Sequence, residues 1–404
     1  MAFCANILGM KKIFTGIFLL LLLLQQNICF ASDISFVYIN GSNNNNEKMK
    51  NWFEKGVRKL HPEIRKTFEE SEQIKQLFLQ KDNFNITEEP VIFFWGDRSK
   101  NDLDFVTERL DMSKDFSPTV AFQVRRLLTQ YMHDAIWVQK PQHMLPIVQN
   151  LNETVKEEFQ KGNEVILYGY SAGTFITYEY LLNTLPYINL EELFNALKVT
   201  DEFRNFVKEN PRQNTCIAAL SDAGIGAVTS GGKLVFNNSE DTLRKHYLDI
   251  DKSTAKVCSP EGAVKGIVNF ASPLVLFYSD LADDDYEITY FNKFMLKYVM
   301  EKGLFFLTVN FREDPIAFPS SDNLTYEEME QILGMTFTDP KGFVFDNSGV
   351  WSWRPFFMAH TSYWAAGKRF SKAVVESVIN GYRYQYDRLY REELKNKSKK
   401  YKLL

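Results

Sequence analysis

The segment "EVILYGYSAGTFITYEYLL", residues Glu164–Leu182, places Ser171 between two glycines, where an apolar run gives way to a helix-like one. A short apolar run, a few small residues and a longer apolar segment are typical of a strand, a tight turn and a helix. In one interpretation, glycine and serine are ordinary turn residues. In the other, Ser171 is a nucleophile held on a strained bend. The remaining motifs of the sequence decide between these two interpretations.

Apolar runs alternate with longer amphipathic segments along the chain. Strands are predicted at residues 34–40, 90–97, 164–169, 263–274 and 304–315. Helices are predicted at residues 47–60, 118–137 and 146–160, directly after Ser171, and from Tyr363 onward. This alternation predicts an α/β fold, in which helices flank both faces of a mostly parallel sheet. In such folds, functional groups lie at the carboxyl ends of the strands.

Residues 184–263 break this alternation. They contain an acidic helix-like piece, residues 190–210, and a glycine-rich piece, residues 221–233. The glycine-rich piece lacks the Lys-Ser/Thr pair of a phosphate-binding loop. We interpret residues 184–263 as an inserted, cap-like segment. Residues 215–220, "TCIAAL", form either part of this insertion or a further strand.

The length, charge and apolar content of the chain limit the class of protein that it can be. The chain has 404 residues, enough for a large core, and a formal net charge of −4. A nucleic-acid binder usually carries a basic surface, so we predict no nucleic-acid partner. Apolar residues make up 45% and charged residues 24%, which is ordinary for a globular protein. We predict one catalytic domain over residues 32–404.

The N-terminus has the features of an export signal. Lys11 and Lys12 precede an apolar run over residues 13–24, which is too short to span a bilayer. A charged start, a short apolar run and a small residue at the exit describe a signal peptide, which we place at residues 1–31 with cleavage after Ala31. The alternative is an uncleaved anchor. We therefore predict an exported protein, periplasmic or secreted.

Two cysteines, Cys216 and Cys258, remain outside the predicted signal peptide. In an exported protein they can form one disulfide, although spacing alone leaves the pairing open. The sequence has no Cys-x-x-Cys pair and no His-Glu-x-x-His segment. We therefore predict no zinc site.

The five residues "GYSAG" match the pattern Gly-x-Ser-x-Gly at Gly169, Ser171 and Gly173. A serine on a tight strand-to-helix turn is held in a strained conformation that exposes its hydroxyl. Side chains two residues before and after it would collide with the neighbouring strand and helix. Ser171 is therefore the predicted nucleophile, and Gly169 and Gly173 complete the elbow.

These features resemble the α/β-hydrolase superfamily, and lipase-like and esterase-like serine enzymes in particular. In that superfamily the order along the chain is Ser, then Asp or Glu, then His. Only His246 and His360 follow Ser171. His246 lies in a polar, helix-like piece of the insertion. His360 lies in a loop just before the last helix, and the resemblance assigns the catalytic base to His360.

The resemblance places the acid at the end of the strand that precedes this histidine. Asp314 follows an apolar strand and precedes Pro315, which ends strand pairing. The run Asp-Pro-Ile at this point is similar to lipase-like members. Glu313 is the neighbouring rival, and Asp280, after an earlier strand, is a weaker one.

Acyl transfer also needs hydrogen-bond donors for the oxyanion. The resemblance assigns one to the backbone N–H of Ala172. The other follows an early strand, where this chain has Asn40, Gly41 and Ser42. The superfamily often has His-Gly there, so the second donor stays open between Gly41 and Ser42. "NFASPL" also resembles a Gly-Ser-Pro-Leu run of lipase-like members, with Ala271 in place of glycine.

The sequence thus predicts a serine hydrolase that cleaves carboxylic esters, as a lipase, phospholipase or esterase does. The implied partners are an ester or lipid substrate and, transiently, a lipid surface. No metal and no organic cofactor are implied. The alternatives are a peptidase or an acyltransferase with the same triad, and a hydrolase-like binding protein without activity. Acyl-chain length and oligomeric state are not predicted.

Overall fold

The computed structural model of this chain describes most of the sequence after the predicted signal peptide. It covers residues 33–42, 47–76, 85–112, 119–185, 190, 194, 200–212, 214–228, 234–235, 239–274, 303–318, 343–355 and 357–386. The predicted signal peptide, residues 1–31, and the rival acid Asp280 lie outside the described residues.

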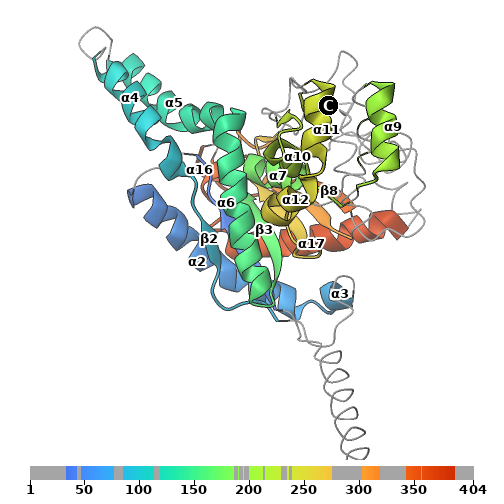
Figure 1. Ribbon diagram of the computed structural model, residues 1–404. Coiled ribbons are helices and arrows are strands. Elements are labelled where there is room, and N and C mark those ends of the chain that lie inside the picture. The colour runs from blue at the N-terminus through green and yellow to red at the C-terminus, as the bar shows by residue number, and fades with distance from the viewer. Residues whose placement is uncertain are drawn as a thin grey trace, which may run out of the picture.

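A six-stranded sheet forms the centre of the molecule (Figure 1). Its strands, in spatial order, are β2 (Val91–Phe93), β1 (Ile34–Ile39), β3 (Glu164–Tyr170), β6 (Val264–Phe270), β7 (Phe305–Phe311) and β8 (Phe343–Val350). Every neighbouring pair is parallel. The predicted α/β architecture with a mostly parallel sheet is confirmed.

The order of the strands places one topological switch point, where the direction of successive connections reverses, between β1 and β3. The chain runs from β1 outward to β2, then returns across β1 to β3 and continues through β6, β7 and β8. Ile39 pairs with both Phe93 and Gly169, so β1, β2 and β3 end close to one another. In open α/β sheets, the crevice between strands that lead in opposite directions is where ligands bind. Here that crevice lies between the ends of β1 and β3.

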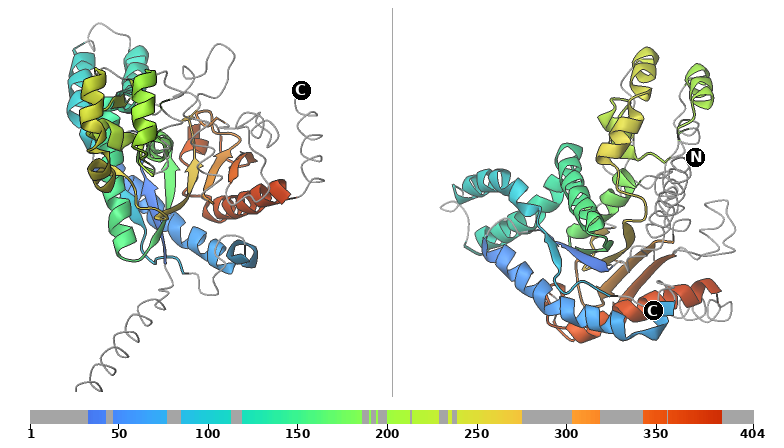
Figure 2. Two further views of the ribbon diagram at one scale, coloured as in Figure 1. Left: turned by 45° about the vertical axis from the view of Figure 1, so that its right-hand side comes forward. Right: turned by 60° about the horizontal axis from the view of Figure 1, so that its bottom comes forward.

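Helices cover both faces of the sheet. On one face, α2 (Glu47–Glu70) packs against α17 (Gly367–Tyr386); on the other, α6 (Pro141–Gln160) packs against α7 (Gly173–Thr184) (Figure 2). The buried residues of α2 recur at helical spacing and face the core: Phe53, Val57, Leu60, Ile64 and Phe68. The central strands β1, β3, β6 and β7 are buried almost throughout, which is typical of a parallel sheet covered on both sides.

Two helical segments project beyond the carboxyl edge of the sheet (Figure 1). One follows β2 and is a hairpin of α4 (Lys100–Asp111) and α5 (Thr119–Val138). The other lies within the predicted insertion, and its described elements include α9 (Asp201–Glu209), α10 (Ile217–Asp222), α11 (Glu240–Tyr247), α12 (Ile250–Val257) and the short strand pair β4 (Ala227–Val228) and β5 (Leu234–Val235). Because α10 is helical, a strand at residues 215–220 is wrong. None of the described helices is long and apolar enough to cross a membrane.

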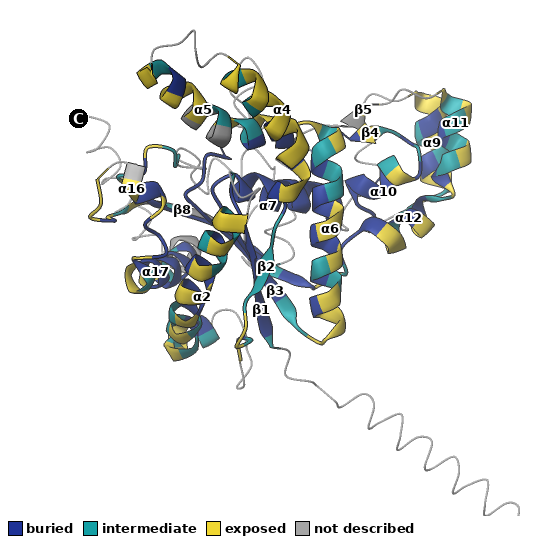
Figure 3. Cartoon of the chain, turned by 90° about the vertical axis from the view of Figure 1, so that its left-hand side faces the viewer, coloured by how far each residue is buried: buried dark blue, intermediate teal, exposed yellow. Residues whose placement is uncertain are grey.

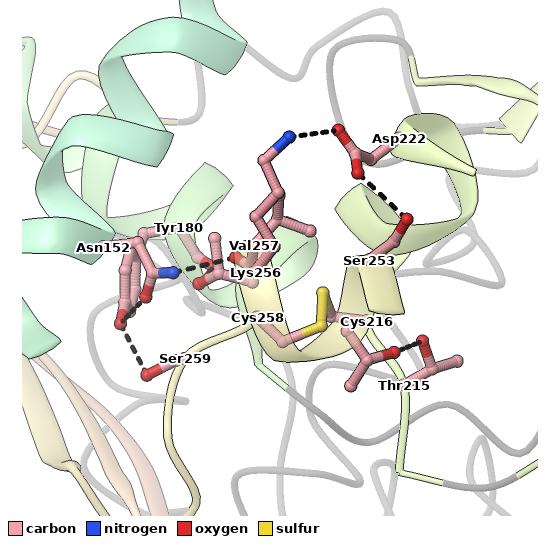
Figure 4. Close-up of a disulfide and its surroundings, with 12 residues drawn as sticks. Asn152, Tyr180, Thr215, Cys216, Asp222, Ser253, Lys256, Val257, Cys258 and Ser259 are labelled. Atoms are coloured by element: carbon pink, nitrogen blue, oxygen red, sulfur yellow. Dashed lines mark hydrogen bonds and ion pairs between the residues drawn. A yellow bond between two sulfur atoms is a disulfide. The ribbon is translucent and has the colours of Figure 1, made fainter. Parts of the chain in front are cut away.

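Cys216 and Cys258 form a disulfide, which joins the start of α10 to the end of α12 (Figure 4). Neighbouring polar contacts fix the same region to the body of the protein. Asn152 Nδ2 on α6 donates to the Val257 carbonyl at 2.8 Å, and Tyr180 OH on α7 donates to Ser259 Oγ at 2.8 Å. The C-terminal part of the insertion is thereby tied to the helical layer behind the sheet.

Candidate active site

Ser171 lies on the sharp turn between β3 and α7, with a backbone φ of +52°. A non-glycine residue in this left-handed region costs on the order of 1–2 kcal/mol, so the surroundings must hold it there. The Ser171 N–H donates to the Phe270 carbonyl at 3.0 Å, and the Thr174 hydroxyl donates to the Ser171 carbonyl at 2.8 Å. These bonds connect the turn to β6 and to the first turn of α7.

The two glycines of the pattern stand where no side chain fits. A Cβ on Gly169 would lie 2.6 Å from Asn269 Oδ1 and 3.0 Å from the Thr174 Cα. A Cβ on Gly173 would lie 2.6 Å from the Ile39 carbonyl oxygen at the end of β1. Such distances are far inside van der Waals contact. A side chain at Gly169 or Gly173 would therefore collide with the neighbouring strand or helix, as the sequence pattern predicts.

Three predicted residues meet at the carboxyl edge of the sheet. His360 Nε2 lies 3.1 Å from Ser171 Oγ, and His360 Nδ1 lies 2.9 Å and 3.0 Å from the two carboxylate oxygens of Asp314. Ser171 follows β3, Asp314 follows β7, and His360 ends the short helix α16 (Phe357–His360) after β8. All three side chains are buried.

The contacts of His360 indicate which of its two ring nitrogens carries the proton. Nδ1 of His360 faces a carboxylate, which accepts, so in the neutral imidazole Nδ1 carries the proton. Nε2 then presents its lone pair to the Ser171 hydroxyl. A base in this position can take the serine proton, and Asp314 can orient the ring and stabilise the imidazolium that forms.

Tyr363 holds Asp314 in place and is a residue that the sequence reasoning missed. Its hydroxyl donates to Asp314 Oδ2 at 3.1 Å and accepts from the Phe311 N–H at 2.8 Å. The Ile316 N–H donates to Asp314 Oδ1 at 3.0 Å. Burial, and then the charge of Asp314, raise the pKa of Tyr363 well above its usual value, so the phenol remains a donor.

Tyr170, directly before Ser171, supports the histidine. Its hydroxyl donates to the His360 carbonyl at 3.0 Å, and its ring centroid lies 5.6 Å from that of the imidazole. The tyrosine ring also packs against Trp364 at 5.1 Å. The end of β3 therefore positions both the serine and the loop that carries the histidine. No local sequence signal marks either tyrosine, because both contacts are long-range.

The rival residues have other contacts. The carboxylate of Glu313 accepts the N–H groups of Ser352 at 2.8 Å and Trp353 at 3.0 Å. Burial raises the pKa of Glu313, but these backbone donors outweigh it and the pKa is lowered overall. His246 lies in α11, with its ring against Gly224. Neither residue takes the place that Asp314 or His360 occupies beside Ser171.

Gly41 approaches the serine from the end of β1. A Cβ on Gly41 would lie 2.7 Å from Ser171 Cβ and 3.3 Å from Ser171 Oγ, so only glycine fits there. Asn40 fixes this loop, because its Nδ2 donates to the Gly41 carbonyl at 2.8 Å and its Oδ1 accepts the Trp95 N–H at 2.9 Å. Ala172 immediately precedes α7. Ser42 follows Gly41 in the chain and is half-buried.

The loop after β6 is tied to the loop that carries Asp314. Ala271 has a backbone φ of +54°, a conformation that costs alanine more than glycine. The Ser272 N–H donates to Asn310 Oδ1 at 3.0 Å, and the Phe318 N–H donates to the Ser272 carbonyl at 2.8 Å. The "NFASPL" run thus braces the loop of Asp314.

Two exposed indoles stand on the loop between β8 and His360. Trp351 and Trp353 stack with their ring centroids 5.8 Å apart, and the Arg312 guanidinium lies 4.7 Å from the Trp351 ring. Trp353 is 73% exposed and has a φ of +60°. Its N–H bond to Glu313 helps to hold it in this conformation.

Among the residues that the structure describes, no three His, Cys, Asp or Glu side chains come together as metal ligands would. No protein-family model, no curated protein and no solved structure significantly matches the chain.

Proposed function

We propose that this protein is an exported serine hydrolase of the α/β-hydrolase type that cleaves carboxylic esters. The observation that carries the proposal is the hydrogen-bonded line from Asp314 through His360 to Ser171, with Ser171 in a left-handed conformation at a strand end. Acid, imidazole and hydroxyl in this order form the constellation that activates a serine for acyl transfer. The export part of the proposal rests on the N-terminal sequence.

The proposed reaction has two halves. Ser171 Oγ attacks the ester carbonyl carbon while His360 Nε2 takes the hydroxyl proton. The bond to the alcohol oxygen then breaks, Nε2 returns its proton to that oxygen, and an acyl-enzyme remains on Ser171. In the second half, water attacks the acyl carbon and gives a proton to His360 Nε2. The bond between Ser171 Oγ and the acyl carbon then breaks, which releases the carboxylic acid, and Nε2 returns the proton to Ser171 Oγ.

Negative charge on the carbonyl oxygen needs fixed donors during both halves. We assign one to the Ala172 N–H at the start of α7, where the helix dipole also favours negative charge. The second comes from the loop of Gly41 and Ser42, whose backbone lies beside Ser171. The Asn40–Trp95 contacts support this assignment, since they fix the loop before substrate arrives.

Apolar side chains near the histidine loop support an apolar ester as the substrate. Trp351, Trp353 and Met358 are exposed on the segment that leads to His360. We further propose that part of the inserted segment, residues 184–263, covers the site as a cap. This part of the proposal rests on the segment lying between α7 and β6 and projecting from the carboxyl edge (Figure 1).

The function is tested with a series of p-nitrophenyl esters from acetate to laurate, alongside the matching anilides. We expect ester turnover that is lost in Ser171→Ala, with anilides cleaved far more slowly. Faster anilide cleavage would indicate a peptidase. Ester product that appears only when an acceptor alcohol is added would indicate an acyltransferase. A folded wild-type protein without turnover on any of these substrates would contradict the proposal.

The cap is tested through the disulfide. Replacing Cys216 and Cys258 together by serine frees the start of α10 from the end of α12. If the segment covers the site, the ratio of activity on laurate to activity on acetate changes. An equal effect on both esters would count against a cap.

A further inference from the structure

Polar side chains in the buried region behind Ser171 form a connected set of hydrogen bonds. Every residue of α7 is buried, as Figure 3 shows. Thr174 on this helix and Ser272 after β6 are fully buried, and Asn310 in β7 is only 1% exposed. Because a buried hydroxyl or amide needs hydrogen-bond partners, the partners of these three side chains show which parts of the fold they hold together.

The backbone of Ser272 holds both ends of the loop that carries Asp314. The Ser272 N–H donates to Asn310 Oδ1 at 3.0 Å, and Asn310 Nδ2 donates to the Phe318 carbonyl at 3.0 Å. The Phe318 N–H donates in turn to the Ser272 carbonyl at 2.8 Å. Asn310 and Phe318 flank residues 311–317, which include Asp314. These three bonds form a closed ring, so the two ends of the loop separate only if one of the bonds breaks.

The hydroxyl of Ser272 reaches the turn of the nucleophile. Ser272 Oγ donates to Thr174 Oγ1 at 3.2 Å, and Thr174 Oγ1 donates to the Ser171 carbonyl at 2.8 Å. A hydroxyl has one proton and two lone pairs, so Thr174 accepts from Ser272 while it donates to Ser171. The Leu274 N–H donates to Ser272 Oγ at 3.3 Å, which leaves the Ser272 proton for Thr174. Ser272 is therefore bonded both to the loop of Asp314 and, through Thr174, to the turn of Ser171.

Backbone strain occurs at the same place. Ser171 and Ala271, at the ends of the paired strands β3 and β6, have φ angles of +52° and +54°. The Ser171 N–H donates to the carbonyl of Phe270, the residue before Ala271. Strained backbone persists only where its surroundings hold it, and strained residues cluster at functional sites. The two strained residues are thus linked, and Ser272 follows directly after the second.

The separation between Ser171 and Asp314 matters because His360 has to bond to both. Its Nε2 lies 3.1 Å from Ser171 Oγ, and its Nδ1 lies 2.9 Å from Asp314 Oδ2. The imidazole ring is rigid, so both bonds form only when the serine and the acid stand the right distance apart. A displacement of about 1 Å at a reacting group can lower a rate by about 10²-fold.

We propose that Ser272 is a positioning residue that fixes the separation of Ser171 and Asp314, with Thr174 and Asn310 as its links. Ser272 acts through these two residues rather than on the substrate. The inference rests on the proposed function, because it concerns the same serine, histidine and aspartate. It goes beyond that function in assigning the alignment of the three to a buried network that joins β3, β6 and β7.

The test removes the hydroxyl bonds and leaves the backbone bonds in place. In Ser272→Ala and in Thr174→Val, we expect kcat for a p-nitrophenyl ester and the rate of fluorophosphonate labelling to fall about tenfold, with KM changed less than about twofold. Thr174→Ser keeps the hydroxyl and should restore both rates. Because Ser272→Ala and Thr174→Val remove the same bond, the double variant should lose little more than Thr174→Val alone.

Ser371→Ala is the matched control. Ser371 is a fully buried serine on α17 whose hydroxyl donates to the Gly367 carbonyl. Its loss should lower the free energy of unfolding in urea without changing kcat, KM or the labelling rate. Circular dichroism verifies that every variant is folded. A merely structural role for Ser272 would give the same result as this control.

A second measurement separates failure of this inference from failure of the proposed function. The proton on His360 Nδ1, which faces Asp314, is followed by NMR whether or not the protein turns over an ester. We expect its resonance to shift in Ser272→Ala and Thr174→Val but not in Ser371→Ala. A wild type without turnover in which the resonance shifts as expected would contradict the hydrolase and support the positioning role. A resonance that Ser272→Ala leaves unmoved would overturn the positioning role, with or without turnover.

Discussion

Two clusters in the described part of the chain contain a serine, a histidine and an aspartate, and they differ in which group stands in the middle. In the candidate active site the imidazole of His360 lies between the acid and the Ser171 hydroxyl. In the second cluster, at the base of the α4–α5 hairpin, Asp134 lies in the middle. Ser99 Oγ is 2.6 Å from Asp134 Oδ1, and His133 Nδ1 is 3.3 Å from the same oxygen.

The difference shows that residue types alone do not make a nucleophile. Ser99 donates toward a carboxylate, which stabilises the serine proton where it is, and no imidazole among the described residues hydrogen-bonds to this hydroxyl. Its backbone φ of −87° is ordinary, whereas Ser171 is held at +52°. His133 and Asp134 are neighbours on one helix, whereas 189 residues separate Ser171 from His360. The hairpin cluster has the contacts of a structural element, and the strand-end cluster has the contacts that the proposed proton transfer requires.

The largest expected effect contrasts the two serines. Ser171→Ala should lower kcat/KM for a p-nitrophenyl ester by at least about 10⁴-fold, because the attacking atom is lost. Ser99→Ala should change it less than about twofold, yet lower stability by about 1–3 kcal/mol, because buried Asp134 loses a donor. Ester kinetics and urea unfolding of both variants measure this. Comparable activity losses in the two variants would show that Ser171 and Ser99 do not differ in role as proposed.

The two aspartates give the next contrast. Asp314→Asn should lower kcat by about 10³–10⁴-fold, since an amide neither fixes the imidazole tautomer nor stabilises its charge. Asp134→Asn is the matched control and should leave kcat nearly unchanged. Stopped-flow or steady-state ester assays decide between them. An Asp314→Asn variant with near-normal kcat would show that Asp314 is not the catalytic acid.

Gly41→Ala tests the approach of the early loop to the serine. The added Cβ would overlap Ser171 Cβ, so the loop must move and its oxyanion donor is displaced, at a cost of about 10²-fold in kcat. Gly349→Ala is the control, since a Cβ there meets nothing closer than 3.8 Å. The assay is ester turnover, with thermal unfolding to verify that both proteins are folded. Equal turnover in the two variants would exclude this role for the Gly41 loop.

Tyr363→Phe sharpens the comparison within the active cluster. It removes one hydrogen bond to Asp314 but keeps the ring, which stacks on Phe311 at 4.0 Å. We expect kcat to fall about five- to tenfold with little change in KM, as one hydrogen bond of about 1–1.4 kcal/mol is lost from the acid. A change in KM alone would instead indicate that Tyr363 contacts the substrate.

The smallest expected effect is that of Glu313→Gln, which should change stability but not catalysis, unlike a change at its neighbour Asp314. Because the folded state lowers the pKa of Glu313, this carboxylate stabilises the fold above its unfolded pKa, and the stabilisation is lost as pH falls through the folded pKa. Glu313→Gln should therefore lower the melting temperature at neutral pH and leave it unchanged at strongly acid pH. It should shift the emission of Trp351 and Trp353, with kcat nearly unchanged. An active-site defect would contradict the role given to Glu313.

Local signals explain what the sequence could predict. The Gly-x-Ser-x-Gly pattern, the apolar strands and Pro315 each depend on a few adjacent residues, and they place Ser171 and Asp314 at strand ends where the structure has them. His360 came from chain order in a family that this sequence resembles. The structure brings the three together, while their catalytic role stays a prediction.

Long-range contacts explain what the sequence did not show. Tyr363, Tyr170 and the Asn40–Trp95 pair act through partners far along the chain. Strand β8 was missed because Asp346, Asn347 and Gly349 disfavour a strand, and pairing with β7 overrides that preference. Helix α4 was missed because it has only one buried residue, Leu103, and so lacks a regular apolar face.

Activation of Ser171 by His360 can be tested by labelling the folded protein with a fluorophosphonate probe and mapping the adduct by mass spectrometry. We expect one adduct, on Ser171, that is absent in Ser171→Ala, strongly reduced in His360→Ala and Asp314→Asn, and unaffected in Ser99→Ala. Labelling on Ser99 or on another serine, or labelling of Ser171 that survives the loss of His360, would contradict the claim that His360 activates Ser171.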